Sequence, residues 1–200
     1  GVRNDYSQRI NIEAFDLGAR TLLVLGYGRI GTRVARLASA FGMTVLVCDE
    51  KFDLGVSEVD GFEIIHDLDE GLARSTFLTV HIPLTDKSAN LIDKDRLLKM
   101  PKGSYLVNCA RGGIVDEQAL TELTQSGHIA ASAFDVFSVE PITVDNPLLS
   151  AKNTQLSPHA AAFTAESLHR MSYQAASNIC DYFNEGVPKA NIYDLDAFTA

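Results

Sequence analysis

The 200-residue sequence has few cysteines, no cluster of basic residues and no long hydrophobic run. The three cysteines, Cys48, Cys109 and Cys180, are odd in number and lack CxxC spacing. We therefore expect reduced thiols that serve packing, and no zinc site. Because the hydrophobic runs are only strand-length and residues 1–10 lack an apolar core, we expect neither a membrane span nor a signal peptide. The sequence favours a cytoplasmic location.

The charge balance is acidic, with a formal net charge of −9. Surfaces that follow a nucleic-acid backbone depend on clustered Lys and Arg, so a nucleic-acid partner is not expected. The hydrophobic fraction of 46% and the charged fraction of 22% are ordinary for a globular protein. The length suffices for one well-buried α/β domain, or for one domain with a fragment of another.

A glycine-rich segment follows the first strand-forming run, Thr21–Leu25, and reads GYGRIG from residue 26. Gly26 permits a tight turn, Gly28 lets the backbone approach a pyrophosphate, and Gly31 lets a helix pack closely on a strand. The segment predicts a dinucleotide-binding strand–helix–strand unit. The alternative is that these glycines serve packing alone.

The predicted helix after this turn ends near Gly42 and is followed by a strand, Thr44–Cys48, that leads into Asp49. A carboxylate at this distance accepts hydrogen bonds from ribose hydroxyls and repels a 2′-phosphate, which favours NAD over NADP. The helix is expected to bury an apolar stripe made of Ile30, Val34, Leu37 and Ala38.

Strands and helices continue to alternate along the chain, with residues 51–61 expected as a loop or irregular helix. Further strands are predicted at 62–66, 77–82, 105–108, 129–134 and 154–157. Further helices are predicted after Asp67 and Asp116, each capped by that aspartate, and at 93–100 and 164–184. This alternation predicts an α/β fold with a doubly wound parallel sheet, which binds ligands at the carboxyl ends of its strands.

An arginine lies in a glycine-rich loop after one of these strands, in the run NCARGGIVDE that ends at Glu117. The guanidinium of Arg111 is suited to grip a substrate carboxylate with two parallel hydrogen bonds, or to polarise a carbonyl. The alternative is that Arg111 anchors its loop or pairs with Asp116.

Acidic and imidazole side chains follow the last strands. Asp135 and Glu140 come after one strand, and His159 comes after the next. A histidine held beside a carboxylate is a general acid and base. Asp135 as a strand terminator and Glu140 as a solvated loop carboxylate are the alternatives, and spacing alone makes His81 nearly as good a candidate as His159.

Four motifs, in order, resemble the nucleotide-binding domain of the D-isomer-specific 2-hydroxyacid dehydrogenases over residues 20–190. They are GYGRIG with Asp49, VHIPLT at 80–85, NCARGGIVDE at 108–117, and FDVFSVEP at 134–141 followed by SPHAA at 157–161. The resemblance implies a Rossmann domain of an NAD-dependent oxidoreductase that interconverts a D-2-hydroxy acid and its 2-oxo acid, with phosphoglycerate the favoured acid.

The resemblance also implies a role for each site residue. Arg111 holds the substrate carboxylate, Glu140 pairs with the histidine, and His159 donates and accepts the proton, which reduces His81 to a strand-end residue. Asp135 orients the nicotinamide amide. The other implied cofactor contacts are Gly26, Gly28, Arg29, Ile30, Gly31, Asp49, Ile82, Pro83, Cys109 and Ala110, with Arg111 and His159 also touching the cofactor. No metal is implied.

Two departures from the family pattern stand out. Tyr27 occupies a position where leucine is usual, and the run 160–163 (AAAF) replaces a glycine-containing run after the histidine. The second departure leaves substrate size open.

The resemblance implies a domain organisation as well. Residues 1–19 form a lead-in arm or interdomain helix, 20–190 the NAD-binding domain, and 191–200 a tail toward a substrate domain that is largely absent from this chain. The chain alone is then expected to bind NAD but to turn over substrate poorly, and to have a homodimer as its protein partner. An NADH-sensing interaction protein similar to the family's corepressors, or a formate or phosphite dehydrogenase relative, are the alternative functions.

Overall fold

The computed structural model describes residues 15–184. Most of the predicted lead-in arm, and the tail from residue 191, lie outside these residues. The chain divides into two units, one that ends at His159 and one that begins at Ala160. The first unit contains the sheet and the motifs, and the described part of the second, up to residue 184, contains one long helix.

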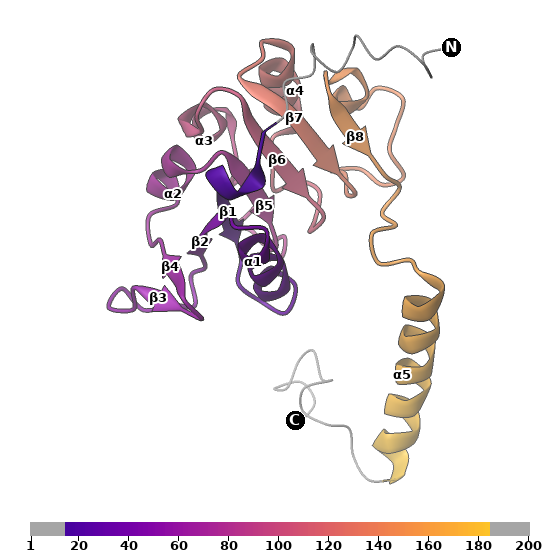
Figure 1. Ribbon diagram of the computed structural model, residues 1–200. Helices are drawn as coiled ribbons and strands as arrows, with labels where there is room; N and C mark the ends of the chain where they lie inside the picture. The colour runs from indigo at the N-terminus through magenta and orange to yellow at the C-terminus, as the bar shows by residue number, and fades with distance from the viewer. Residues whose placement is uncertain (1–14, 185–200) are drawn as a thin grey trace, which may run out of the picture. The chain divides into compact units, whose positions relative to one another are not determined.

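An eight-stranded sheet forms the centre of the first unit (Figure 1). All neighbouring strands are parallel except β3 and β4, and the order is β3-β4-β2-β1-β5-β6-β7-β8. The predicted doubly wound α/β fold is confirmed, with its switch point between β1 and β5. The strands are β1 (Thr21–Leu25), β2 (Thr44–Cys48), β3 (Glu58–Val59), β4 (Phe62–Ile64), β5 (Phe77–Val80), β6 (Ser104–Asn108), β7 (Ile129–Phe134) and β8 (Thr154–Leu156).

Three of the helices of this unit begin where aspartates cap them. The carboxylates of Asp67, Asp93 and Asp116 accept hydrogen bonds from backbone N–H groups two or three residues further on. Each bond satisfies an N–H that the first turn leaves unpaired. The α-helices are α1 (Gly31–Ala40), α2 (Leu68–Arg74), α3 (Lys94–Lys99) and α4 (Glu117–Gln125), and the 3₁₀ turns are η2 (Leu17–Ala19) and η3 (Pro147–Ser150).

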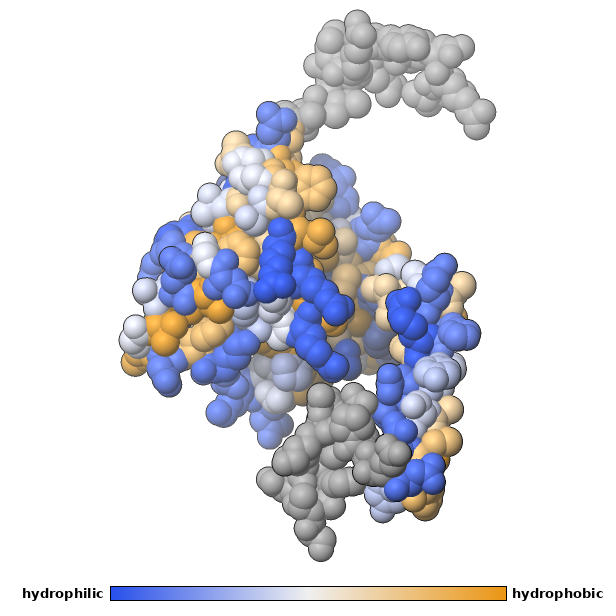
Figure 2. Space-filling view, turned by 60° about the horizontal axis from the view of Figure 1, so that its bottom comes forward, coloured by the Kyte–Doolittle hydropathy of each residue, from blue (hydrophilic) through white to orange (hydrophobic). Residues whose placement is uncertain are grey.

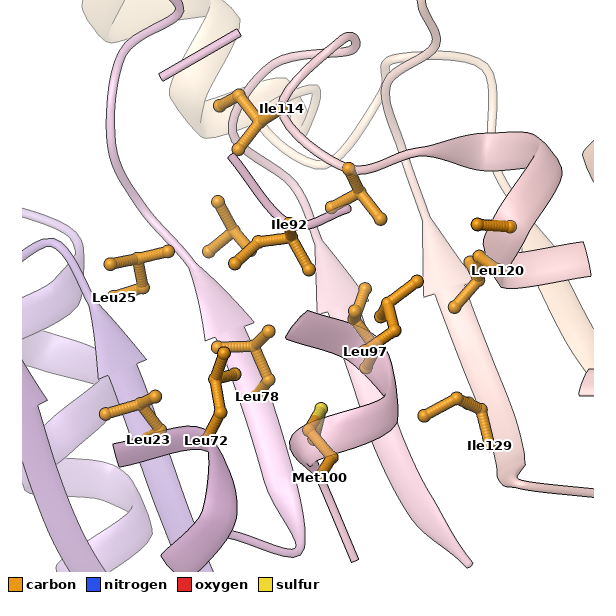
Figure 3. Packing of buried hydrophobic residues seen from close by; sticks show 14 of the residues in the cluster. Leu23, Leu25, Leu72, Leu78, Ile92, Leu97, Met100, Ile114, Leu120 and Ile129 are labelled. Atoms are coloured by element: carbon orange, nitrogen blue, oxygen red, sulfur yellow. The ribbon is translucent and has the colours of Figure 1, made fainter. Parts of the chain in front are cut away.

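Two hydrophobic clusters hold these helices against the sheet. The larger cluster joins Leu72 of α2, Leu97 of α3 and Leu120 of α4 to inward-facing strand residues such as Leu23 and Leu78 (Figure 3). The smaller cluster joins α1 to those residues of β1 and β2 that alternate with the strand residues of the larger cluster, including Val24 and Val47. Because alternate strand residues point to opposite faces, α1 lies on the other face of the sheet from α2, α3 and α4.

The predicted apolar stripe of α1 is wrong in two of its four members. Ile30 and Leu37 are each 63% exposed, whereas the helix buries the predicted Ala38 together with Gly31 and Ala35. A Cβ added at Gly31 would lie 1.9 Å from the carbonyl oxygen of Gly26. The helix therefore sits too close to the end of β1 for large side chains, and its small residues face the sheet.

Residues 51–61 contain a strand that the loop prediction missed. β3 pairs antiparallel with β4 through a tight turn at Asp60 (φ 52°) and Gly61 (φ 82°). Two-residue hairpin turns of this kind need positive φ at both positions, and Asp-Gly is a sequence that supplies it. The turn was therefore readable from the sequence, whereas the short strands beside it show no clear pattern.

The second unit contains helix α5 (Ala165–Asn184), which begins one residue after its predicted start. Hydrophobic and hydrophilic residues both lie on its surface (Figure 2), and Leu168, Met171 and Ile179 are among its exposed apolar residues. Within residues 15–184, no helix is long and apolar enough to cross a membrane.

All three cysteines are free thiols, as predicted. Packing explains only one of them, because Cys48 is buried whereas Cys109 and Cys180 are exposed. Burial, followed by the charges of Asp49 and Asp67, raises the pKa of the Cys48 thiol to about 11. Cys48 is therefore protonated and unreactive at neutral pH.

The close contact at Gly31 predicts a large cost for a single methyl group. We expect Gly31→Ala to lower the free energy of unfolding by about 3 kcal/mol, although alanine is the better helix former. Urea denaturation measures the difference. Gly55→Ala is the matched control, because a Cβ there meets nothing within 4 Å, and it should change stability by less than about 0.5 kcal/mol. A G31A protein as stable as the parent would show that α1 can move away from β1.

Candidate active site

The glycine turn after β1 has the geometry that close backbone packing requires. Gly26 has φ +97°, and a Cβ there would lie 2.7 Å from the carbonyl carbon and oxygen of His81. A Cβ at Gly28, in contrast, would meet no atom within 4 Å. The turn is thus tight on the side of the sheet and open at Gly28, where a diphosphate would approach the N-terminus of α1.

Asp49, the acid after β2, is fixed beside this turn. Its Oδ2 accepts a hydrogen bond from the backbone N–H of Tyr27 at 2.6 Å, and its Oδ1 accepts one from the backbone N–H of Lys51 at 3.0 Å. An ionised carboxylate has about four acceptor sites, so both oxygens keep capacity for further donors such as ribose hydroxyls.

A cavity of about 350 Å³ opens at the carboxyl ends of β1, β2 and β5, next to the switch point of the sheet. Five predicted cofactor residues line it, namely Gly26, Gly28, Asp49, Ile82 and Pro83. The cavity wall also includes residues that the motif analysis did not assign to the cofactor, namely Thr85, Lys87, Ser88 and Leu91. Thr85 ends the VHIPLT motif and the other three follow it. This position beside the motif was the only indication in the sequence that they line the cavity.

Tyr27, the second residue of the glycine turn, joins this turn to the β3–β4 hairpin. Its side chain is 4% exposed, and its hydroxyl donates a hydrogen bond of 2.8 Å to Asp60. Arg36 of α1 reaches the same carboxylate oxygen at 3.0 Å. The Lys51 ammonium donates to the Tyr27 carbonyl oxygen and lies 4.9 Å from the centre of the Phe52 ring. Tyr27 thereby braces the turn whose N–H holds Asp49, a role that its sequence position did not reveal.

His81 lies at the wall of this cavity and is bonded to its own strand. Its Nε2 lies 2.9 Å from the hydroxyl oxygen of Thr79, and burial lowers the pKa of its imidazole. His81 is therefore neutral near pH 7, and among the described residues no carboxylate is recorded as its hydrogen-bond partner.

The loop after β6 is held in shape by Asn108. The buried side chain of Asn108 accepts a hydrogen bond from the Ala110 N–H at 3.0 Å and donates one to the Arg111 carbonyl at 2.9 Å. This clamp closes the turn Cys109–Arg111 and leaves the Arg111 side chain exposed. Of the two alternatives for Arg111, the loop contact is present, because its Nη1 donates to the Ala110 carbonyl at 2.6 Å. Asp116 caps α4, and within residues 15–184 no ion pair joins it to Arg111.

Glu140 and His159 form a pair at the next two strand ends. The His159 Nδ1 lies 2.7 Å from the Glu140 Oε2, and the Glu140 Oε1 accepts the Phe137 N–H at 2.9 Å. The His159 contact first, then the Phe137 N–H, with a smaller contribution from the charge of Arg111, hold the pKa of Glu140 below its usual value. Glu140 is therefore a carboxylate at neutral pH, and it orients the imidazole.

The imidazole of His159 is presented by an unusual backbone. His159 has φ +51°, in the left-handed region that residues other than glycine adopt at a cost. With Glu140, Phe137, Pro141, Ile142 and Pro158, it lines a cavity of about 390 Å³. Only the surrounding structure can maintain such a conformation, so the position of the imidazole is strongly determined.

The remaining predicted residues differ in how near they lie to the Glu140–His159 pair and to the two cavities. Asp135 is buried, and its carboxylate accepts a hydrogen bond of 2.5 Å from the Ser157 hydroxyl, next to the turn that carries His159. Arg29 and Ile30 are exposed at the start of α1 and line neither cavity.

A glycine turn at the switch point of a doubly wound sheet, with an acid after the second strand, defines a dinucleotide-binding domain of the Rossmann type. The turn, the open space at Gly28 and the free acceptor capacity of Asp49 all fit such a cofactor. The chain belongs to the D-isomer specific 2-hydroxyacid dehydrogenase family, because the model of that family's NAD binding domain matches residues 2–161. NAD is therefore the cofactor of this domain.

The names of individual relatives are consistent with this family assignment. The chain is 42% identical over 159 residues to the D-3-phosphoglycerate dehydrogenase of Methanocaldococcus jannaschii, covering 80% of this chain and 30% of that protein. It is 40% identical to the glyoxylate reductase of Aeropyrum pernix, covering 86% of this chain and 51% of that protein. The NAD complex of an NAD-dependent formate dehydrogenase from Staphylococcus aureus superposes with a TM-score of 0.81 at 32% identity, covering 92% of this chain and 54% of that one. The chain thus spans about half or less of the length of these relatives.

The position of Asp49 predicts how the choice of dinucleotide can be changed. We expect Asp49→Asn to shift the ratio of the NADH and NADPH dissociation constants by about tenfold toward NADPH, because the charge that repels a 2′-phosphate is removed. Fluorescence titration of the chain with each cofactor measures the ratio. Glu58→Gln removes the same charge from an exposed residue of β3 that does not line the cavity, and it should change the ratio far less. An equal shift in both variants would assign the effect to net charge.

Proposed function

We propose that the protein containing this chain is an NAD-dependent oxidoreductase that interconverts a D-2-hydroxy acid and its 2-oxo acid, and that this chain is its cofactor domain. The observation that carries the proposal is the Glu140–His159 pair, 2.7 Å apart. It lies in the same unit as the glycine turn, beyond strands β7 and β8, next to the loop that presents Arg111. The names of the relatives support the same class of reaction.

The chain's own residues account for binding and proton transfer. When bound, NADH supplies the hydride for the carbonyl carbon of the 2-oxo acid. The guanidinium of Arg111 holds the substrate carboxylate by two parallel hydrogen bonds. Because the Nδ1 of His159 faces Glu140, its Nε2 is the atom that protonates the developing alkoxide, and the Glu140 charge stabilises the protonated imidazole. In the oxidative direction the same Nε2 accepts the hydroxyl proton.

The cofactor contacts proposed from the family motifs extend along the carboxyl ends of the strands. Asp49 receives the adenosine ribose, the amides near Gly28 receive the diphosphate, and Asp135 orients the nicotinamide amide. The further proposed contacts are Gly26, Arg29, Ile30, Gly31, Ile82, Pro83, Cys109, Ala110, Arg111 and His159.

We also propose a second domain outside residues 20–190, reached through the segments 1–19 and 191–200, which completes the substrate site and selects the acid. The difference in length from the relatives supports it. A second copy of the chain is the proposed protein partner, because Leu37 and Phe41 present exposed apolar side chains on and beside α1. The three free thiols fit a reducing, cytoplasmic location.

The substrate is testable by a direct screen. We expect the full-length protein to oxidise NADH with at least one of phosphohydroxypyruvate, hydroxypyruvate, glyoxylate and pyruvate, with phosphohydroxypyruvate the first choice. Absorbance at the NADH band, measured in parallel with NADPH, reports turnover. Saturable NADH binding without turnover of any acid would contradict the proposal and favour a dinucleotide sensor. Turnover of formate alone would favour a formate dehydrogenase relative.

The proton-transfer role of His159 predicts a separation of chemistry from binding. We expect His159→Ala in the full-length protein to lower kcat by roughly a hundredfold or more, since it removes the general acid and base. The NADH dissociation constant should rise far less than kcat falls, because the glycine turn and Asp49 are untouched and His159 is only one of the proposed cofactor contacts. His169→Ala alters an exposed histidine of α5 and serves as the control. Parental kcat in H159A would remove His159 from the mechanism.

A further inference from the structure

Glu117, the first residue of α4, is a buried carboxylate held by the loop that follows β7. Glu117 is 8% exposed. Its Oε1 accepts the Ser138 N–H at 2.7 Å, and its Oε2 accepts the Ser138 hydroxyl at 2.9 Å and the Asn146 side-chain amide at 2.8 Å. No ion pair recorded for residues 15–184 includes Glu117. Three neutral donors therefore stabilise its charge.

The loop after β7 also lies in close contact with the loop after β6, which leads into α4. A Cβ added at Gly112 would lie 1.9 Å from the carbonyl carbon and oxygen of Phe137 and 2.5 Å from the Ser138 nitrogen. Gly112 directly follows Arg111. The backbone that presents the guanidinium is thus in contact with the backbone that leads to Glu140.

Glu117 is bonded to Ser138, the neighbour of the residue whose N–H is bonded to Glu140. Ser138 follows Phe137, whose N–H donates to the Glu140 Oε1 at 2.9 Å, and the other oxygen of Glu140 is bonded to His159. Asn146 anchors the far end of this loop, because its side chain also accepts the Leu148 N–H at 2.9 Å. Glu117 therefore grips the loop on both sides of Glu140.

We propose that Glu117 is a positioning residue for the reaction: through Ser138 and Asn146 it holds the Glu140–His159 pair in register with Arg111. The inference rests on the proposed function. Hydrogen bonds to an ionised acceptor are shorter and stronger than neutral ones, so a buried carboxylate fixes this loop more tightly than a neutral side chain. Glu117 itself does not touch the substrate or the cofactor.

A purely structural role gives different expectations. A carboxylate in the first turn of a helix also stabilises that helix through its dipole. If this were its whole contribution, removing the charge would lower stability and leave kcat and its pH dependence unchanged in the folded protein. Kinetics of folded variants therefore distinguish the two roles.

The primary test is Glu117→Gln in the full-length protein. An amide at this position turns one acceptor into a donor that faces the Asn146 amide. We expect kcat to fall by about tenfold or more and the pH profile of kcat/KM to move, while the NADH dissociation constant stays within about twofold. Glu122→Gln, the same change at an exposed position of α4 bonded to Lys94, should leave all three unchanged. Parental kcat and an unmoved pH profile in folded E117Q would overturn the proposal.

A second substitution tests the hydrogen bonds themselves. In the double variant E117Q/N146D the donor and the acceptor exchange places. The amide introduced at position 117 can donate to the carboxylate introduced at position 146, and that carboxylate can still accept from the Leu148 N–H. We expect kcat to return to within about fivefold of the parent. A folded double variant no more active than E117Q would contradict the proposal.

Two measurements keep the test decisive if E117Q does not fold or the protein turns over no acid. Ser138→Ala removes only the hydroxyl bond to Glu117, and it should still move the pH profile and lower kcat by about threefold. In the chain itself, S138A should speed hydrogen exchange of the Phe137 amide by about threefold or more, whether or not any acid is reduced. Unchanged Phe137 exchange would overturn the inference, whereas faster exchange without turnover would contradict only the proposed function.

Discussion

The approach of helix α1 to the end of strand β1 is the constraint on which the dinucleotide site depends. The carbonyl of Gly26 occupies the space that any side chain at position 31 would need. This contact directs small residues of α1 toward the sheet and places the start of the helix beside the turn whose Tyr27 N–H is bonded to Asp49. Tyr27, lying between them, fills the adjoining gap and links the turn to the β3–β4 hairpin through Asp60. One contact between backbones thus determines where a dinucleotide can lie.

The proposed acid–base groups are brought together by three neighbouring strands. β6, β7 and β8 are adjacent and parallel, so the residues that follow them emerge at the same edge of the sheet. Strand order alone brings the Arg111 loop, Glu140 and His159 into one region. The finer placement comes from side chains, because Asn108 closes the arginine turn and Glu117 holds the loop that carries Glu140.

Local signals in the sequence predicted most of the elements, and long-range contacts explain what it missed. Asp67 and Asp116 predicted their helices correctly, since a cap bonds to an N–H two or three residues away. The spacing of apolar residues along α1 could not show that Leu37 points outward, because the buried face of the helix is decided by how closely α1 approaches β1. The partners of Glu117 are 21 and 29 residues distant, and no spacing rule reaches so far. The Glu140–His159 contact was anticipated only through the family motifs.

The strand order also divides the proposed site residues into two groups. Asp49 and the hairpin that braces its neighbour lie on the β2 side of the switch point, whereas Arg111, Glu140 and His159 lie on the side of β6, β7 and β8. A substitution at Asp49 would therefore leave the proposed proton-transfer groups on the other half in place. Along the chain, the junction between the two groups falls between β4 and β5, and the proposed cofactor contacts at Ile82, Asp135 and His159 stay with the second group.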